Sequence, residues 1–205
     1  MLRTRLTDVL GVEHPVMLAG MGGVSYHRLV AAVSEAGGYG CFGASTLPAE
    51  ELRAEMRAAR ALTDKPFGVD LLTALPQRLL EDVALLIDEG ATVFAAGLGI
   101  PHDVISMCHE RNVLVLSMCG KVRHAVAAVE AGCDIVVAQG GHGSHLDGDE
   151  REEVVHREDL GEALGALGEV GLAGGGNEGF EIGLVVGAAA DFAVFALVHV
   201  GAEAA

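Results

Sequence analysis

The sequence predicts an α/β fold, a (β/α)8 barrel of the TIM type, formed by residues 1–205 as a single domain. Short apolar runs alternate with longer segments of helical periodicity, and glycine or a small polar cluster follows each run. The composition agrees, because 51% of the residues are hydrophobic and 29 are glycine while only 4% are aromatic, as in closely packed parallel strands and helices. Eight apolar runs are expected to form the strands: 16–19, 39–42, 67–71, 92–95, 114–118, 134–138, 170–173 and 192–198.

The segments between these runs have the pattern of helices. Residues 26–36 and 123–131 repeat apolar side chains at helical spacing, and each segment is followed by a glycine, Gly37 or Gly132, of the kind that ends helices. Repeated strand and helix units imply parallel strands with right-handed crossovers. Eight units favour a closed barrel, with an open doubly wound sheet as the alternative. Only HVGAEAA follows the last run in this sequence. We therefore expect a barrel without its final helix, whose rim another subunit completes in a homo-oligomer.

The charge of the chain excludes several classes of partner. The formal net charge is −16, which repels a nucleic acid backbone and an anionic membrane surface. The charge is uneven, because nine acidic residues lie in segment 147–169 against Arg151 and Arg157, and no Lys or Arg follows Arg157. We interpret this segment as a solvated face or loop.

Cysteine usage and the N-terminus indicate a cytoplasmic protein without a structural metal. The four cysteines, Cys41, Cys108, Cys119 and Cys133, lie far apart and form no CxxC pair, so they are expected to be buried thiols. Segment 1–15 holds two arginines but no long apolar core, so neither a signal peptide nor a membrane span is predicted there.

The candidate site follows from the barrel, because the active site of such a fold lies at the carboxyl ends of the strands. Glycine clusters at Gly20–Gly23 and Gly174–Gly176 leave backbone N–H groups free for an anion or a flat ring. A planar cofactor would then lie against the first cluster, with its phosphate on the second. Asp70, Lys121 and the segment 139–145 follow other strands of the predicted barrel.

Several blocks of the chain resemble the flavin-dependent nitronate monooxygenases, formerly called 2-nitropropane dioxygenases. The resemblance is close from about residue 6 to residue 140 and fades afterwards, with AGGGNEGF and GAAADFAVFA as weaker matches to the phosphate-binding end of the family. The blocks that match in order are PVMLAGMGGVS, AAVSEAGGYGCFGAST, KPFGVDLL and SMCGKVRHAVAAVEAGCDIVVAQG.

The resemblance implies a barrel that holds FMN. A cation at Lys121, one of two lysines in the chain, would stabilise a reduced, anionic flavin. Asp70 stands where the family more often has Asn; its carboxylate could accept the flavin N3–H but would add an unwanted charge. The implied cofactor-binding residues are Ala19, Gly20, Met21, Gly22, Asp70, Lys121, Gln139, Gly140, Gly174, Gly175, Gly176, Ala196 and Leu197.

A histidine after the sixth strand is implied as the catalytic base. Imidazole suits the removal of a proton beside a nitro group, because its pKa lies near neutrality. The family motif has a carboxylate, two glycines and then the histidine, whereas this chain reads GGHGSH. His145 is the candidate base and His142 the alternative; either imidazole could instead be a polar loop residue.

The predicted function is the oxidation of alkyl nitronates, or of neutral nitroalkanes, by an FMN-dependent enzyme with O2. Three departures from the family pattern keep other hypotheses open: Ala196-Leu197-Val198 replaces a Gly-Thr or Gly-Ser pair, the acidic segment replaces an apolar one, and a later substrate-covering portion is absent. The alternatives are a flavin enoyl reductase, an NAD(P)H:quinone reductase, or a degenerate barrel without catalysis.

Overall fold

The structure is a computed structural model that describes residues 3–73, 76–97, 102–119, 122–138, 182–186 and 194–199. Within these segments, strands and helices alternate along most of the chain. Their order is α1 (Arg5–Leu10), β1 (Val16–Leu18), α2 (His27–Glu35), β2 (Gly40–Gly43), α3 (Ala49–Arg60), β3 (Phe67–Leu72), α4 (Pro76–Asp88), β4 (Val93–Gly97), α5 (His102–His109), β5 (Leu114–Cys119), α6 (Val122–Glu130), β6 (Ile135–Ala138), β7 (Ile182–Val186) and β8 (Val194–His199).

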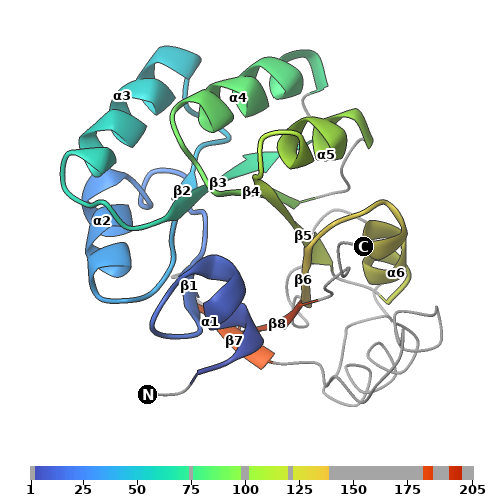
Figure 1. The fold of residues 1–205 in the computed structure, drawn as a ribbon. Coiled ribbons are helices and arrows are strands. Elements are labelled where there is room, and N and C mark those ends of the chain that lie inside the picture. Colours follow the sequence, from blue (N-terminus) through green and yellow to red (C-terminus); the bar gives the residue numbers. More distant parts are fainter. Residues whose placement is uncertain are drawn as a thin grey trace.

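The strands form a closed barrel, which confirms the predicted fold class. Their order in the sheet is β1-β7-β8-β6-β5-β4-β3-β2. A parallel bridge between Met17 and Tyr39 joins β1 to the start of β2 and closes the sheet. Figure 1 shows the strands in the middle, with α2 to α6 around their outside. The carboxyl ends of β1 to β6 therefore meet at one edge of the barrel.

Local sequence accounts for the first six strands and for the helices between them. The positions of these strands, and of α2 and α6, the two helices predicted with bounds, agree with the prediction to within two residues. The amphipathic helix α3 buries Leu52, Met56 and Ala59, which lie at helical spacing on one face. After α2 and α6, Gly37 and Gly132 have φ values of 86° and 100°. These left-handed conformations favour glycine, as the helix-ending pattern predicted.

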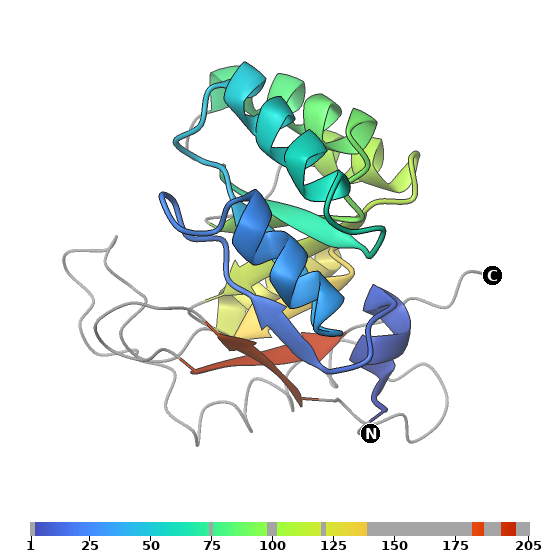
Figure 2. The same cartoon turned by 90° about the vertical axis from the view of Figure 1, so that its left-hand side faces the viewer.

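The core has an outer layer and an inner layer. In the outer layer, the large side chains Phe42, Phe67 and Phe94 lie between the strands and the helices. The inner layer fills the barrel and includes Tyr39, Ala95, Leu116 and Ile135. Helix α1 closes the end of the barrel where the strands begin, since its Leu6 and Leu10 pack into the inner layer; Figure 2 shows it at that end.

The last two strands differ from the predicted pattern. The run 170–173 lies outside the described residues, and β7 is formed by residues 182–186, which were not predicted as a strand. Strand β8 is antiparallel to both β6 and β7, whereas a parallel strand was expected. The connection 187–193 explains this, because it is shorter than the dozen or so residues of a parallel crossover.

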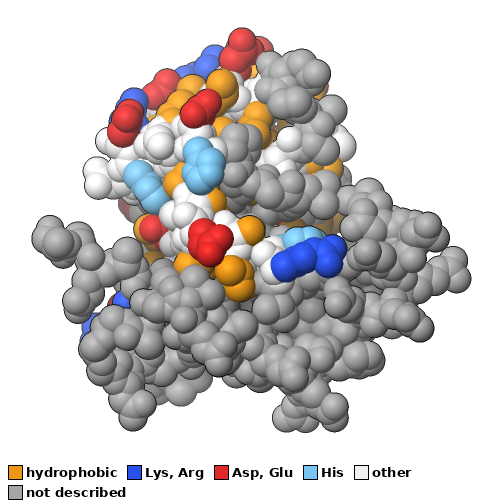
Figure 3. Space-filling model, turned by 90° about the vertical axis from the view of Figure 1, so that its right-hand side faces the viewer, with side chains coloured by type: hydrophobic (Ala, Val, Ile, Leu, Met, Phe, Trp, Pro, Cys, Tyr) orange, Lys and Arg blue, Asp and Glu red, His pale blue; other side chains and the backbone are white. Residues whose placement is uncertain are grey.

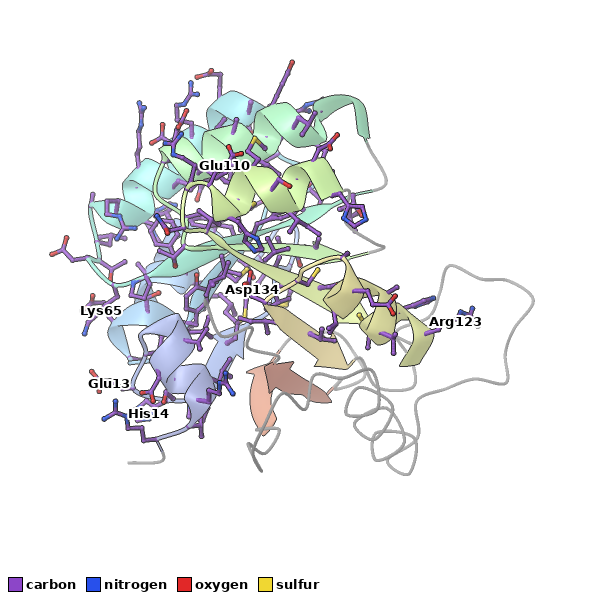
Figure 4. The ribbon with its side chains drawn as sticks, turned by 45° about the vertical axis from the view of Figure 1, so that its right-hand side comes forward. Glu13, His14, Lys65, Glu110, Arg123 and Asp134 are labelled. Carbon is purple, nitrogen blue, oxygen red and sulfur yellow. The ribbon has the colours of Figure 1, made fainter. Side chains whose placement is uncertain are left out.

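Polar contacts tie the outer elements together at the edge where the strands begin. The Asp134 carboxylate, labelled in Figure 4, accepts the Val115 N–H at 2.7 Å and lies 3.0 Å from His109 Nε2. It therefore links α5, β5 and β6. In the same figure Lys65 lies near Glu13, with 3.9 Å between Lys65 Nζ and Glu13 Oε1.

The surface and the thiols agree with the composition. All four cysteines are buried and free, as predicted. On the face in Figure 3, described acidic and basic side chains alternate with apolar and uncharged ones, so this described surface has no continuous basic patch. Among the helices that the structure describes, none is long and apolar enough to cross a membrane.

Candidate functional site

The turn after β1 is held in one shape by Ser25. The buried Ser25 hydroxyl donates to the Ala19 carbonyl at 2.8 Å and accepts the Met21 N–H at 3.2 Å. Further along the turn, the Gly23 N–H donates to the Tyr26 hydroxyl at 3.1 Å, and Gly23 has a φ of 80°. The glycine-rich turn is therefore a fixed element before any ligand binds.

Two glycines are required here because other groups approach their Cα atoms. A Cβ at Gly20 would lie 2.3 Å from the Asp70 Cβ, and a Cβ at Gly43 would lie 2.3 Å from the Met21 carbonyl carbon. Neither distance is possible between non-bonded carbons, so both positions need glycine. Gly22 differs, because the nearest described atom to its Cβ would be Thr46 Oγ1 at 3.6 Å.

Hydrogen bonds join the loops that follow β1, β2 and β3. The Gly43 N–H donates to the Ser25 carbonyl at 3.3 Å, and the Ala44 N–H donates to the Asp70 carbonyl at 3.0 Å. The Leu72 N–H donates to the Ser45 hydroxyl at 2.9 Å. These three loops form one unit at the carboxyl edge of the barrel, which is where sites of this fold lie.

Asp70 is a buried acidic side chain of this unit. In the sheet it is in register with Gly43 on one side and with Ala95, an inner-layer residue, on the other. Residues in register on neighbouring strands face the same side, so the Asp70 carboxyl points into the barrel. Its exposed fraction is only 8%, and no described residue donates a hydrogen bond to the carboxyl.

Burial gives this carboxyl an unusual proton affinity. Removal from water disfavours the ionised form and raises the pKa of Asp70 to about 7. Near neutral pH the group therefore exists in both protonated and ionised forms, and the charge expected from the sequence is partly suppressed. The pKa of the neighbouring Cys41 thiol is also raised, first by burial and then by the charge of Asp70.

The other described thiols are not activated nucleophiles. Burial raises the pKa of Cys108 and of Cys119 to about 11 and the pKa of Cys133 to about 12, so all three stay protonated at neutral pH. Among the described residues, no group of three or more His, Cys, Asp or Glu side chains could hold a metal ion.

Only part of the predicted site lies within the described residues. Ala19, Gly20, Met21, Gly22 and Asp70 lie together at the carboxyl edge. Residues Ala196 and Leu197 lie inside β8, in register with Ala138 and Val137 of β6, and not after the strand as the family comparison implied. The predicted residues outside the described segments are Lys121, Gln139, Gly140, His142, His145, Gly174, Gly175 and Gly176.

The sequence analysis did not identify Ser25 and Gly43 as parts of the site. A signal for Ser25 exists in GMGGVS, since a serine at the end of a glycine-rich turn often bonds the turn's backbone. Gly43 ends a buried strand, where a glycine often marks close approach of another backbone.

Comparison with known proteins identifies the relatives of this chain. Residues 3–82 match the family model described as nitronate monooxygenase. A probable nitronate monooxygenase of Staphylococcus saprophyticus is 30% identical over 174 residues, which cover 68% of this chain and 49% of that protein. A (3aS,4S,5R,7aS)-5-hydroxy-7a-methyl-1-oxo-octahydro-1H-indene-4-carboxyl-CoA dehydrogenase of Mycobacterium tuberculosis is 38% identical over 142 residues, which cover 69% of this chain and 40% of that protein.

A solved structure supports the same relationship. FabK from Thermotoga maritima superimposes with a TM-score of 0.65 and 36% sequence identity, over 69% of this chain and 47% of that one. The chain thus spans half or less of the length of these relatives. The family model, the curated relatives and the solved structure agree with the blocks found in the sequence: residues 3–82 match the nitronate monooxygenase model, and the chain is similar to a probable nitronate monooxygenase over about half of that protein's length.

Proposed function

We propose that the protein is an FMN-dependent oxidoreductase that oxidises alkyl nitronates with O2. The observation that carries this proposal is the buried Asp70 carboxyl beside the Gly20 turn, at the carboxyl edge of the barrel. A buried polar group without a described partner calls for a polar ligand. The flavin ring fits this requirement, because it is flat enough to lie on the exposed backbone of the turn and has polar atoms along one edge.

Each residue of the proposed site has a role that its chemistry suits. The open side of Gly22 would face the ring, Asp70 would bind its polar edge, and the backbone N–H groups of Gly174–Gly176 would hold the phosphate. The Lys121 ammonium would stabilise negative charge on the reduced ring. FMN, when bound, would accept electrons from the substrate, and O2 would then reoxidise it. His145 would remove the α-proton when the substrate is a neutral nitroalkane, with His142 as the alternative base.

A second function is favoured by one specific observation. The Mycobacterium tuberculosis relative, which is named as a dehydrogenase of a CoA thioester, is more identical to this chain than the nitronate monooxygenase relative is, at 38% against 30%. A flavin enoyl reductase or an NAD(P)H:quinone reductase would use the same FMN site. The third hypothesis is a barrel without catalysis.

Flavin content and parallel assays distinguish these functions. The purified full chain is mixed with FMN, freed of excess ligand and examined for flavin absorbance. Oxygen consumption with an alkyl nitronate is then compared with NADH oxidation in the presence of a quinone or of an enoyl-CoA. Activity on nitronate alone supports the proposal, whereas activity only with NADH supports the second function. A protein that retains no FMN contradicts both.

A further inference from the structure

Asp70 differs from the other buried polar side chains that the structure describes. Each of the buried hydroxyl groups has a hydrogen-bond partner, whereas the Asp70 carboxyl receives no hydrogen bond from a described residue. Those hydroxyl groups belong to Thr7, Ser25, Ser34, Thr63 and Ser117. A carboxyl that is 8% exposed and lies at the carboxyl edge is therefore available to a ligand there.

We propose that Asp70 binds the imide edge of the flavin as a protonated carboxylic acid, so that ionisation of Asp70 weakens FMN binding. This inference rests on the proposed function. The imide edge presents an N–H group flanked by carbonyl oxygens. A protonated carboxyl matches it with two hydrogen bonds, because its carbonyl oxygen accepts the N–H while its hydroxyl donates to a flavin carbonyl.

The ionised form makes a poorer partner for the same edge. One carboxylate oxygen still accepts the N–H, but the other then faces a flavin carbonyl oxygen without a proton between them. Two acceptors in contact repel each other, and this repulsion is strong in a site from which water is excluded. A primary amide in this place keeps both hydrogen bonds at every pH. Asparagine is therefore the variant that isolates the effect of the proton.

Among the described residues that face the Asp70 carboxyl, no other side chain titrates near neutral pH. Cys41 on β2 is the titratable side chain that faces it, and burial keeps that thiol protonated. Ala95 on β4, the turn 19–23 and the loop 44–47 present no ionisable or charged side chain to it. Since burial brings the pKa of Asp70 to about 7, the proton is lost within an accessible pH range.

The size of the effect follows from this pKa. If the protonated form alone binds, the apparent Kd is nearly unchanged below the pKa and rises tenfold for each pH unit above it. Between about pH 6 and about pH 8.5 the Kd for FMN is expected to rise about 30-fold. At about pH 8 the Asp70 carboxyl of the free protein is mostly ionised, so FMN binding is expected to take up nearly one proton from solvent to protonate it.

The test measures FMN binding to the full chain by quenching of flavin fluorescence, at about pH 6 and about pH 8.5. Three proteins are compared: the wild type, Asp70→Asn, and Asp64→Asn as a control at an exposed aspartate before β3. Ionisation of the FMN phosphate is common to all three and cancels in the comparison. The wild type and Asp64→Asn are expected to lose affinity about 30-fold more than Asp70→Asn does as the pH rises.

A calorimetric measurement on the wild type keeps the proposal testable should Asp70→Asn fold poorly. Proton uptake on FMN binding is obtained at about pH 8 from titrations in two buffers of different ionisation enthalpy. Uptake close to one proton supports the proposal, and no uptake overturns it. If FMN binds equally well at both pH values, or Asp70→Asn has the same pH dependence as the wild type, the inference fails while the proposed function stands. If FMN binds at neither pH, both fail.

Discussion

Replacement of Asp70 by asparagine is expected to stabilise the ligand-free protein, and more strongly at high pH. Burial raises the pKa of this carboxyl from its ordinary 3.8 to about 7. Between these values the unfolded chain has released the proton while the folded chain still holds it. The free energy of unfolding therefore falls as the pH rises through this window. At about 1.4 kcal/mol per pH unit, the full loss is about 4 kcal/mol, reached above the folded-state pKa.

The asparagine side chain escapes this loss, because it has no proton to release. Its buried amide has its own desolvation cost, but that cost is the same at every pH. The gain in unfolding free energy from Asp70→Asn should therefore be larger at about pH 8 than at about pH 5, by about 2.5 kcal/mol.

Urea unfolding of the ligand-free wild type and of Asp70→Asn at these two pH values measures this difference. Asp64→Asn, at an exposed position, serves as the control and should change the unfolding free energy by less than about 0.5 kcal/mol at either pH. An Asp70→Asn effect of equal size at both pH values would refute the reasoning, since it would mean that the folded carboxyl titrates as it does in the unfolded chain.

Four further predictions concern the turn, the strand that packs against it and the base. Gly43→Ala should lower the unfolding free energy by about 3 kcal/mol in urea titrations, because its Cβ would overlap the Met21 backbone. Gly22→Val should fold normally but bind no FMN, which is measured as missing flavin absorbance. Ser25→Ala should cost about 1–3 kcal/mol by the same titrations, since it removes two hydrogen bonds that hold the turn; an unchanged midpoint would contradict this. His145→Ala should lose about 10²- to 10⁴-fold activity on neutral nitroalkane but little activity on nitronate. If His142→Ala shows this selective loss and His145→Ala does not, His142 is the base.

The sequence predicts the first six strands well because each is a short apolar run that is buried on both faces. The runs at 170–173 and 182–186 are alike in length and glycine content, so the local pattern could not tell which one pairs with β1. The antiparallel direction of β8 follows from the short connection before it, a signal that the repeat pattern obscured.

The candidate site was predictable in position but not in its electrostatics. The rule that polar residues at strand ends form the site identified Asp70 and the turn of Gly20. The raised pKa comes from burial of the carboxyl, and the residues in register with Asp70, Gly43 and Ala95, come from other strands and lie beside it only in the folded chain. No spacing rule contains this information.

The glycine turn and the buried carboxyl depend on each other. A Cβ at Gly20 would occupy the place of the Asp70 side chain, so glycine there is what allows the carboxyl to lie inside the barrel beneath the turn. The same close contact helps to bury the carboxyl, and burial raises its pKa to about 7. A side chain at position 20 would push the carboxyl toward solvent and return its pKa toward the ordinary value. Gly22 is the glycine whose open side is proposed to face the flavin ring, whereas Gly20 sets the proton affinity of the group proposed to bind the edge of that ring.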